Sequence, residues 1–206
     1  AQQWRATLRE AMDKLRDRLA QIYESIMSKY VADPYDVRNK YISVLLNRDT
    51  MEDFLSGMVR ERPAHEEKVR IMKLLEMQRH SLLMYTSCGW FFDDISGIEA
   101  VQILQYACRA MQLGNEVSGS DFEPTFKDIL EKAPVNAKEF ANGKEVYEML
   151  ARSCRADLNR VGAHFAISSI FAEYPEEADV FCYSASTEQY DRLEAGIQVL
   201  ATGRAA

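Results

Sequence analysis

The sequence has 206 residues, a length that suits one compact domain. Hydrophobic residues make up 47% of it and aromatic residues 10%, which excludes an intrinsically disordered chain. Its 9 glycines and 5 prolines are too few for a turn-dense β-sandwich. The 25 basic residues against 32 acidic ones give a net charge of −7, and a negative surface repels phosphate. We therefore expect no nucleic-acid partner and no membrane partner, and no apolar run approaches the roughly 20 residues of a membrane span.

The cysteines and histidines give no sign of a metal or cofactor site. The four cysteines lie far apart and form no CxxC pair: Cys88, Cys108, Cys154 and Cys182. This spacing is typical of reduced thiols and favours a cytoplasmic location. The three histidines also lack the spacing of zinc ligands. We expect neither a metal nor a cofactor.

Apolar periodicity predicts helices through the first half of the chain. Apolar residues at steps of three and four draw one stripe from Trp4 to Tyr30. Asp33 and Pro34 indicate an N-cap followed by proline in the first helical position. Thr50 resembles the first residue of a capping box. The predicted helices cover residues 4–30, 34–46, 50–59 and 63–85.

Two further helices are predicted to begin at capping boxes. Ser96 with Glu99 opens one that runs to residue 111, and Ser120 with Glu123 opens another. From residue 143 the apolar spacing continues to 171, which predicts one long helix bent at Gly162.

The chain changes character after Pro175. Val180 to Tyr183 is β-prone, and Ala195-Gly196 is a turn signal before a second β-prone run. We expect a β-hairpin that begins a sheet continuing in the parent protein, because two strands alone are marginal in water. The predicted fold is mainly α. A bundle of about six helices covers residues 1–174, and a short C-terminal β-hairpin covers 175–206.

Residues 86–95 lack any helical period and hold the strongest candidate site. Trp90, Phe91 and Phe92 are followed at once by Asp93 and Asp94, between two predicted helices. Sugars bind flat apolar faces and carboxylates that accept from hydroxyls, and an apolar platform with a few polar groups is typical of a ligand site. A second interpretation stays open. The aromatic residues can plug the end of the bundle while Asp94 caps the next helix.

Four stretches resemble a known protein region: LLEMQRH at 74–80, MYTSCGWFFDD at 84–94, QILQYACRA at 102–110 and DPYDVRNKYI at 33–42. They are similar to the uncharacterised helical region that follows the catalytic barrel in bacterial proteins of glycoside hydrolase family 57. The resemblance implies that the catalytic residues lie on that barrel, outside this sequence. It also implies that the segment from Ser87 to Asp94 lines a sugar cleft.

The resulting hypothesis is an accessory helical domain that shapes a carbohydrate cleft and does not itself cleave the bond. Its partners are the N-terminal catalytic barrel of the same polypeptide and an oligosaccharide or polysaccharide. Trp90 is predicted to be the stacking platform, and Asp93 and Asp94 are predicted to accept from sugar hydroxyls. Arg79 is predicted to orient the segment. Ser87 and Gly89 are predicted to be positions where the sugar approaches the backbone closely. The alternative is a structural or protein-interaction module with no ligand site.

Overall fold

The computed structural model describes residues 2–60, 63–180 and 183–206. The fold is mainly α with a small C-terminal antiparallel sheet, as predicted. Internal contacts divide the chain into two units, Ala1–Arg155 and Ala156–Ala206. The boundary expected at 174/175 marks the change from helix to strand, and as a domain boundary it stays a prediction.

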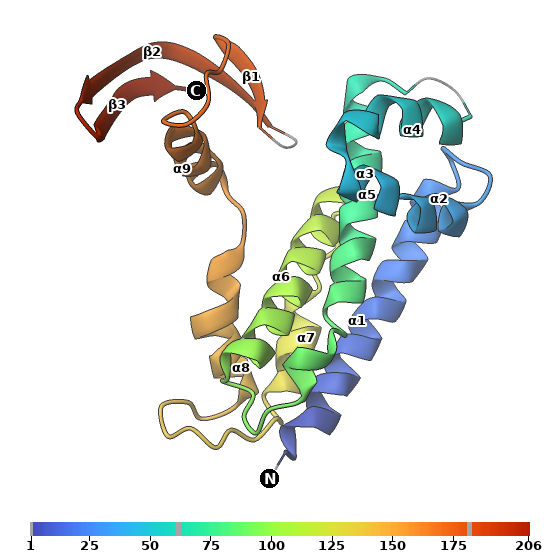
Figure 1. Ribbon diagram of the computed structural model, residues 1–206. Helices are drawn as coiled ribbons and strands as arrows, with labels where there is room; N and C mark the ends of the chain where they lie inside the picture. The colour runs from blue at the N-terminus through green and yellow to red at the C-terminus, as the bar shows by residue number, and fades with distance from the viewer. Residues whose placement is uncertain (1, 61–62, 181–182) are drawn as a thin grey trace. The chain divides into compact units, whose positions relative to one another are not determined.

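Three long helices form the body of the first unit. Helices α1 (Trp4–Met27), α5 (His65–Leu83) and α6 (Ile98–Ser118) run side by side, and α7 (Glu123–Leu130) packs against α1 (Figure 1). The remaining elements of this unit are shorter: α2 (Pro34–Lys40), α3 (Ile42–Leu46), η1 (Arg48–Thr50), α4 (Met51–Met58), η2 (Ser87–Trp90), α8 (Gly143–Val146), η3 (Tyr147–Ala151) and η4 (Arg152–Cys154).

The core follows the predicted stripe along α1. Trp4, Leu8, Met12, Leu15, Leu19 and Ile26 are buried there against side chains of α5 and α6. Tyr23 is fully buried as well, and its hydroxyl donates to the carbonyl of Pro34 at 2.6 Å, so a residue outside the predicted stripe anchors the turn into α2. Burial of apolar area on one helix face is what holds such a bundle together.

One predicted N-terminal cap is confirmed and the capping boxes are not. The Asp33 carboxylate accepts from the backbone N–H groups of Tyr35 and Asp36, with Pro34 in the first turn. Thr50 instead donates its hydroxyl to the carbonyl of Asn47. The capping boxes predicted at Ser96 and Ser120 do not form either. Helix α6 begins after Gly97 and α7 after Phe122, and neither residue provides a side-chain cap.

The long helix predicted from 143 to 171 is wrong. The chain passes from α8 through the π-helical turn η3 and the 3₁₀ turn η4, and it becomes extended at Arg155. The helix restarts only after Asp157, whose carboxylate accepts from the backbone N–H of Arg160 at 2.9 Å. Asp favours this N-cap position over a helix interior, so it marks a new start. Gly162 lies inside the new helix and not at the bend.

The second unit consists of α9 (Leu158–Ser168) and a three-stranded sheet. Strands β1 (Glu177–Val180), β2 (Tyr183–Ala195) and β3 (Gln198–Ala205) are antiparallel in the order β1-β2-β3. The predicted turn after Ala195 is confirmed, with Gly196 at a φ of 63°. Val180 and Tyr183 were expected in one strand and instead pair across two, while Phe181 and Cys182 lie outside the described residues.

Candidate functional site

The segment from Ser87 to Asp94 crosses from α5 to α6 and starts with η2. Gly89 of η2 is buried against α6, where a Cβ on it would lie 2.4 Å from Cγ2 of Ile103. Atoms in ordinary contact stay about 3.5–4.0 Å apart, so only glycine fits here without a shift. Gly89 was predicted to let a sugar approach the backbone closely. In the structure, the group that lies close to Gly89 is the Ile103 side chain of α6.

Trp90 is half-buried between two aromatic rings from other elements. Its indole stacks with Trp4 of α1 (ring centroids 6.4 Å apart, 23° between planes) and with Tyr85 (6.4 Å, 8°). Its Nε1–H donates to the backbone carbonyl of Met84 at 3.3 Å. The indole thus has protein neighbours on its rings and a satisfied polar atom, and part of its surface still faces solvent.

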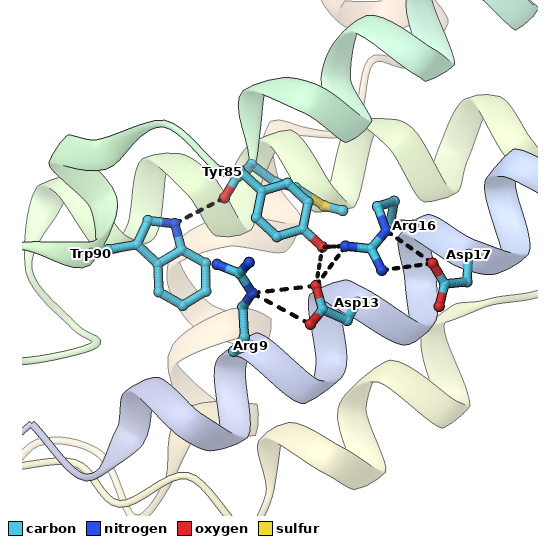
Figure 2. A network of polar contacts seen from close by, with 7 residues as sticks. Arg9, Asp13, Arg16, Asp17, Tyr85 and Trp90 are labelled. Atoms are coloured by element: carbon cyan, nitrogen blue, oxygen red, sulfur yellow. Dashed lines mark hydrogen bonds and ion pairs between the residues drawn. The ribbon is translucent and has the colours of Figure 1, made fainter.

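A charged network from α1 borders the same rings (Figure 2). The Arg9 guanidinium lies 4.8 Å from the Tyr85 ring centroid and 5.6 Å from that of Trp90. The Tyr85 hydroxyl donates to Asp13 Oδ1 at 2.7 Å, and Arg16 pairs with the same oxygen at 2.8 Å. Burial opposes ionisation of Asp13, but the Tyr85 hydrogen bond and the two guanidinium charges hold its pKa below the ordinary value.

Sequence analysis missed this network because its members lie in a different helix from the aromatic segment. The sequence placed Trp4 on the apolar stripe of the first helix, and no role was predicted for Arg9 or Arg16. The one available signal was the charge spacing. Arg9 and Asp13 are four residues apart, and Asp13 and Arg16 three apart, which places all three on one face of α1.

The two adjacent aspartates have different surroundings. Asp94 accepts from the N–H and hydroxyl of Ser96 at 2.9 and 2.6 Å, and from the N–H of Asn136 at 2.5 Å. Burial tends to raise the pKa of Asp94, but these hydrogen bonds, with one from the N–H of Ala137, lower it below its ordinary value. The Asp93 side chain is exposed and accepts only a 3.3 Å bond from Gln2 in the described structure. Asp94 is therefore a structural clamp, while Asp93 is available to solvent.

Arg79 lies on α5, and its guanidinium pairs with a carboxylate of that helix. Its Nη1 contacts Glu76 Oε2 at 3.0 Å, and Glu76 also accepts from the Tyr41 hydroxyl at 2.5 Å. Arg79 was predicted to orient the aromatic segment, and among the described residues the carboxylate it pairs with is instead Glu76. Burial disfavours the Glu76 carboxylate, yet the hydrogen bonds from Tyr41 and Arg79 lower its pKa.

The outermost part of the segment is aromatic. Phe91 is 74% exposed and Phe92 is 48% exposed, with their rings edge to face at 5.5 Å. Ser87 is exposed beside them. We call the surface formed by Ser87, Trp90, Phe91, Phe92 and Asp93 the aromatic corner. It offers apolar rings and one exposed carboxylate, a set of groups suited to binding rather than to bond cleavage.

The structure gives the aromatic corner no metal site. In the described ranges, no three or more His, Cys, Asp or Glu side chains gather closely enough to hold a metal ion. The helices within those ranges are also too short or too polar to cross a membrane.

Comparison with known protein families gives a match over the whole chain. The model of the family described as a domain of unknown function, DUF3536, matches residues 1–206. The chain belongs to the DUF3536 family. No curated protein and no solved structure matches it. DUF3536 membership assigns no activity, and the resemblance to the helical region of glycoside hydrolase family 57 enters below as a proposal.

Proposed function

We propose that this DUF3536 domain is a non-catalytic accessory domain of a glycoside hydrolase of the family-57 type. In this proposal its aromatic corner contacts the saccharide that a catalytic barrel of the same polypeptide cleaves. The sequence resemblance motivates the link to carbohydrate. The observation that carries it is the pair Phe91 and Phe92, exposed on a segment whose backbone is held by contacts from α1.

The side chains of the segment divide into contact and support. The rings of Phe91 and Phe92 and the exposed part of Trp90 cover C–H faces of the sugar, and Asp93 accepts from its hydroxyls. Gly89 and Asp94 support the segment through α6 and Asn136. Ser87 is an exposed hydroxyl at the edge, and Arg79 has no direct part because it pairs with Glu76.

The acids of the segment argue against cleavage by this domain alone. Glycosidases place two carboxyl groups about 5–9.5 Å apart on opposite sides of the scissile bond. Asp93 and Asp94 are neighbours in the chain, and both Asp94 oxygens already accept hydrogen bonds within the protein. Hydrogen bonds within the protein thus engage both Asp94 oxygens in holding the segment, which supports a contribution through binding.

Intrinsic fluorescence tests the proposal directly. The chain has two tryptophans, Trp4 and Trp90, and they stack on each other at the aromatic corner. We expect titration with α-glucan oligosaccharides to give a saturable change in tryptophan emission. Phe91→Ala should abolish the change, and Leu46→Ala, at an 82% exposed position on α3, should retain it. An unchanged spectrum at millimolar sugar would refute saccharide binding, and equal responses from both variants would refute binding at the aromatic corner.

A second candidate, a structural or protein-interaction module, is supported by the stacking of Trp90 between Trp4 and Tyr85. It predicts that Trp90→Ala costs about 3–5 kcal/mol, as truncation of a large packed ring does. It also predicts that Phe91→Ala changes no sugar response, because none exists. Urea unfolding together with the titration above separates the two functions.

A further inference from the structure

A second chemically distinctive cluster lies elsewhere in the helical unit, where η4 meets α6. Cys108 on α6 is buried, with 1% of its surface exposed, and Cys154 on η4 is half-buried. Both residues are thiols in the structure. They belong to one compact unit, although 46 positions separate their numbers along the chain.

Helix geometry brings the two sulfurs together. Cys154 Sγ lies 3.5 Å from the carbonyl oxygen of Gln105 on α6. Side chains in a helix point back toward its N-terminus, so the Cys108 side chain lies over the turn that contains Gln105. The Cys154 thiol accordingly lies within hydrogen-bonding reach of Cys108.

Polar groups surround this pair on the side of α7 and η3. The Tyr147 hydroxyl donates to Glu123 Oε1 at 3.0 Å and lies close to Cys108. Arg155 and Arg152 pair with the same carboxylate at 3.3 and 3.4 Å. Tyr147 belongs to the π-helical turn η3, a feature often found at functional sites.

These neighbours favour the reactive form of Cys108. The neighbouring Cys154 side chain lowers the pKa of Cys108 against the opposing effect of burial, and Tyr147 lowers it further, to about 7. The thiolate is the nucleophilic form of cysteine, so a lowered pKa makes a thiol more reactive near neutral pH. A metal site does not explain the cluster, since the described residues hold no set of three or more metal-ligating side chains.

We propose that Cys108 and Cys154 are a redox-responsive thiol pair that closes to an intramolecular disulfide. Cys154, the less buried of the two residues, is the thiol that meets the oxidant. Cys108, buried beside it, is the resolving thiol. The disulfide would join η4 to α6 and so fix the last turn of the helical unit.

The chemistry balances with a hydroperoxide as oxidant. Cys154 passes its thiol proton to the neighbouring Cys108 thiolate and attacks one oxygen of hydrogen peroxide. The O–O bond breaks, and hydroxide leaves as water with the proton that Cys108 had released. Cys154 is then a sulfenic acid. The Cys108 thiolate attacks the Cys154 sulfur, the S–O bond breaks, and a second hydroxide leaves as water with the Cys108 proton. Two thiols lose two electrons, and one peroxide becomes two waters.

Peroxide treatment followed by mass spectrometry tests the pair. The full chain carrying Cys88→Ser and Cys182→Ser is treated with a small excess of hydrogen peroxide and then alkylated under denaturing conditions. We expect the intact mass to fall by about 2 Da, with a linked peptide joining Cys108 to Cys154. The melting temperature should rise by about 5–15 °C and fall again on reduction. Cys154→Ala in this background is the matched control, and its Cys108 should stay reduced.

Two results would overturn the proposal. Both cysteines could still be alkylated after treatment, or Cys154 could gain about 32 Da as a sulfinic acid while Cys108 remains a thiol. If the substituted chain does not fold, peptide mapping of the unsubstituted chain gives the same decision. A link between Cys108 and Cys154 supports the pair, and a link through exposed Cys88 alone refutes it.

Discussion

Replacing Gly89 by alanine tests how η2 is held against α6. The added Cβ would meet three atoms of Ile103, Cγ2 at 2.4 Å, Cδ1 at 2.7 Å and Cγ1 at 2.8 Å. Ile103 is buried and β-branched, so it cannot swing away freely. Relief requires a shift of about 1 Å in η2 or in the side chain, and overpacking of this kind costs about 1–3 kcal/mol.

A double-mutant cycle makes the cause specific. Ile103→Ala removes all three atoms that the new Cβ would meet, at its own cost of about 2–5 kcal/mol. In that background Gly89→Ala should cost nothing and even stabilise by about 0.4–1 kcal/mol, because φ at Gly89 is not positive and alanine restricts the unfolded chain. The coupling between the two positions should therefore be about 1.4–4 kcal/mol, the difference between the cost with Ile103 present and the gain without it.

Urea unfolding measures these free energies. Circular dichroism follows the helices, while tryptophan emission follows the segment itself through Trp90 and Trp4. Gly57→Ala is the matched control, since a Cβ there meets nothing within 4 Å. Close packing of Gly89 on Ile103 is refuted if Gly89→Ala lowers the free energy of unfolding by less than about 0.5 kcal/mol. It is also refuted if that loss is the same with and without the Ile103 side chain.

Three further outcomes follow from the charged and thiol groups. Asp94→Ala should lower the free energy of unfolding by about 1–3 kcal/mol and Asp93→Ala by less than about 0.5, as measured by urea unfolding; equal losses would contradict the clamp. The pKa of Glu76 is lowered in the folded state, so its stabilisation is present above its unfolded value of 4.5 and is lost as pH falls further. Urea midpoints from pH 7 to 3 should therefore fall less steeply in Glu76→Gln, and parallel slopes would exclude this role. Disulfide closure between Cys108 and Cys154 should quicken as pH rises through about 7, where Cys108 loses its proton; a rate that ignores pH would count against Cys108 as the attacking thiol.

The long helices could be predicted because their signal is local and repeats many times. The stripe on α1 places an apolar residue on one face at each turn, and burial then selects that face. Asp33 with Pro34 was predictable for the same reason, as the cap depends only on adjacent residues. The Ser96 signal failed because Asp94, two residues before it, accepts from both the N–H and the hydroxyl of Ser96.

The break after η4 shows the limit of apolar spacing. The pattern from residue 143 onward continues through Cys154 and Leu158, so periodicity alone gives no reason to stop. The helix ends after Cys154 because Cys154 packs against Gln105 of α6 and Asp157 caps a new helix. The first of these contacts joins residues 49 apart, and no local window contains both.

The aromatic corner could be located from the sequence but not understood from it. Its composition stands out in the segment itself, whereas Trp4 and Arg9, which surround the Trp90 ring, come from the start of the chain. Asn136, whose N–H binds Asp94, is likewise remote in the sequence, 42 residues after it. Which aspartate is clamped and which is exposed follows only from these long-range contacts.

Those contacts also bear on why Phe91 and Phe92 are exposed. The Phe91 carbonyl accepts from Arg5 at 2.7 Å, and the Asp93 carbonyl accepts from the Trp4 indole at 2.9 Å. The backbone on either side of Phe92 is therefore tied to α1, while the rings project to solvent. Apolar rings on a backbone that is already ordered lose little further entropy on binding. A partner that covers these rings would offset the cost of exposing them, as the proposed contact surface requires.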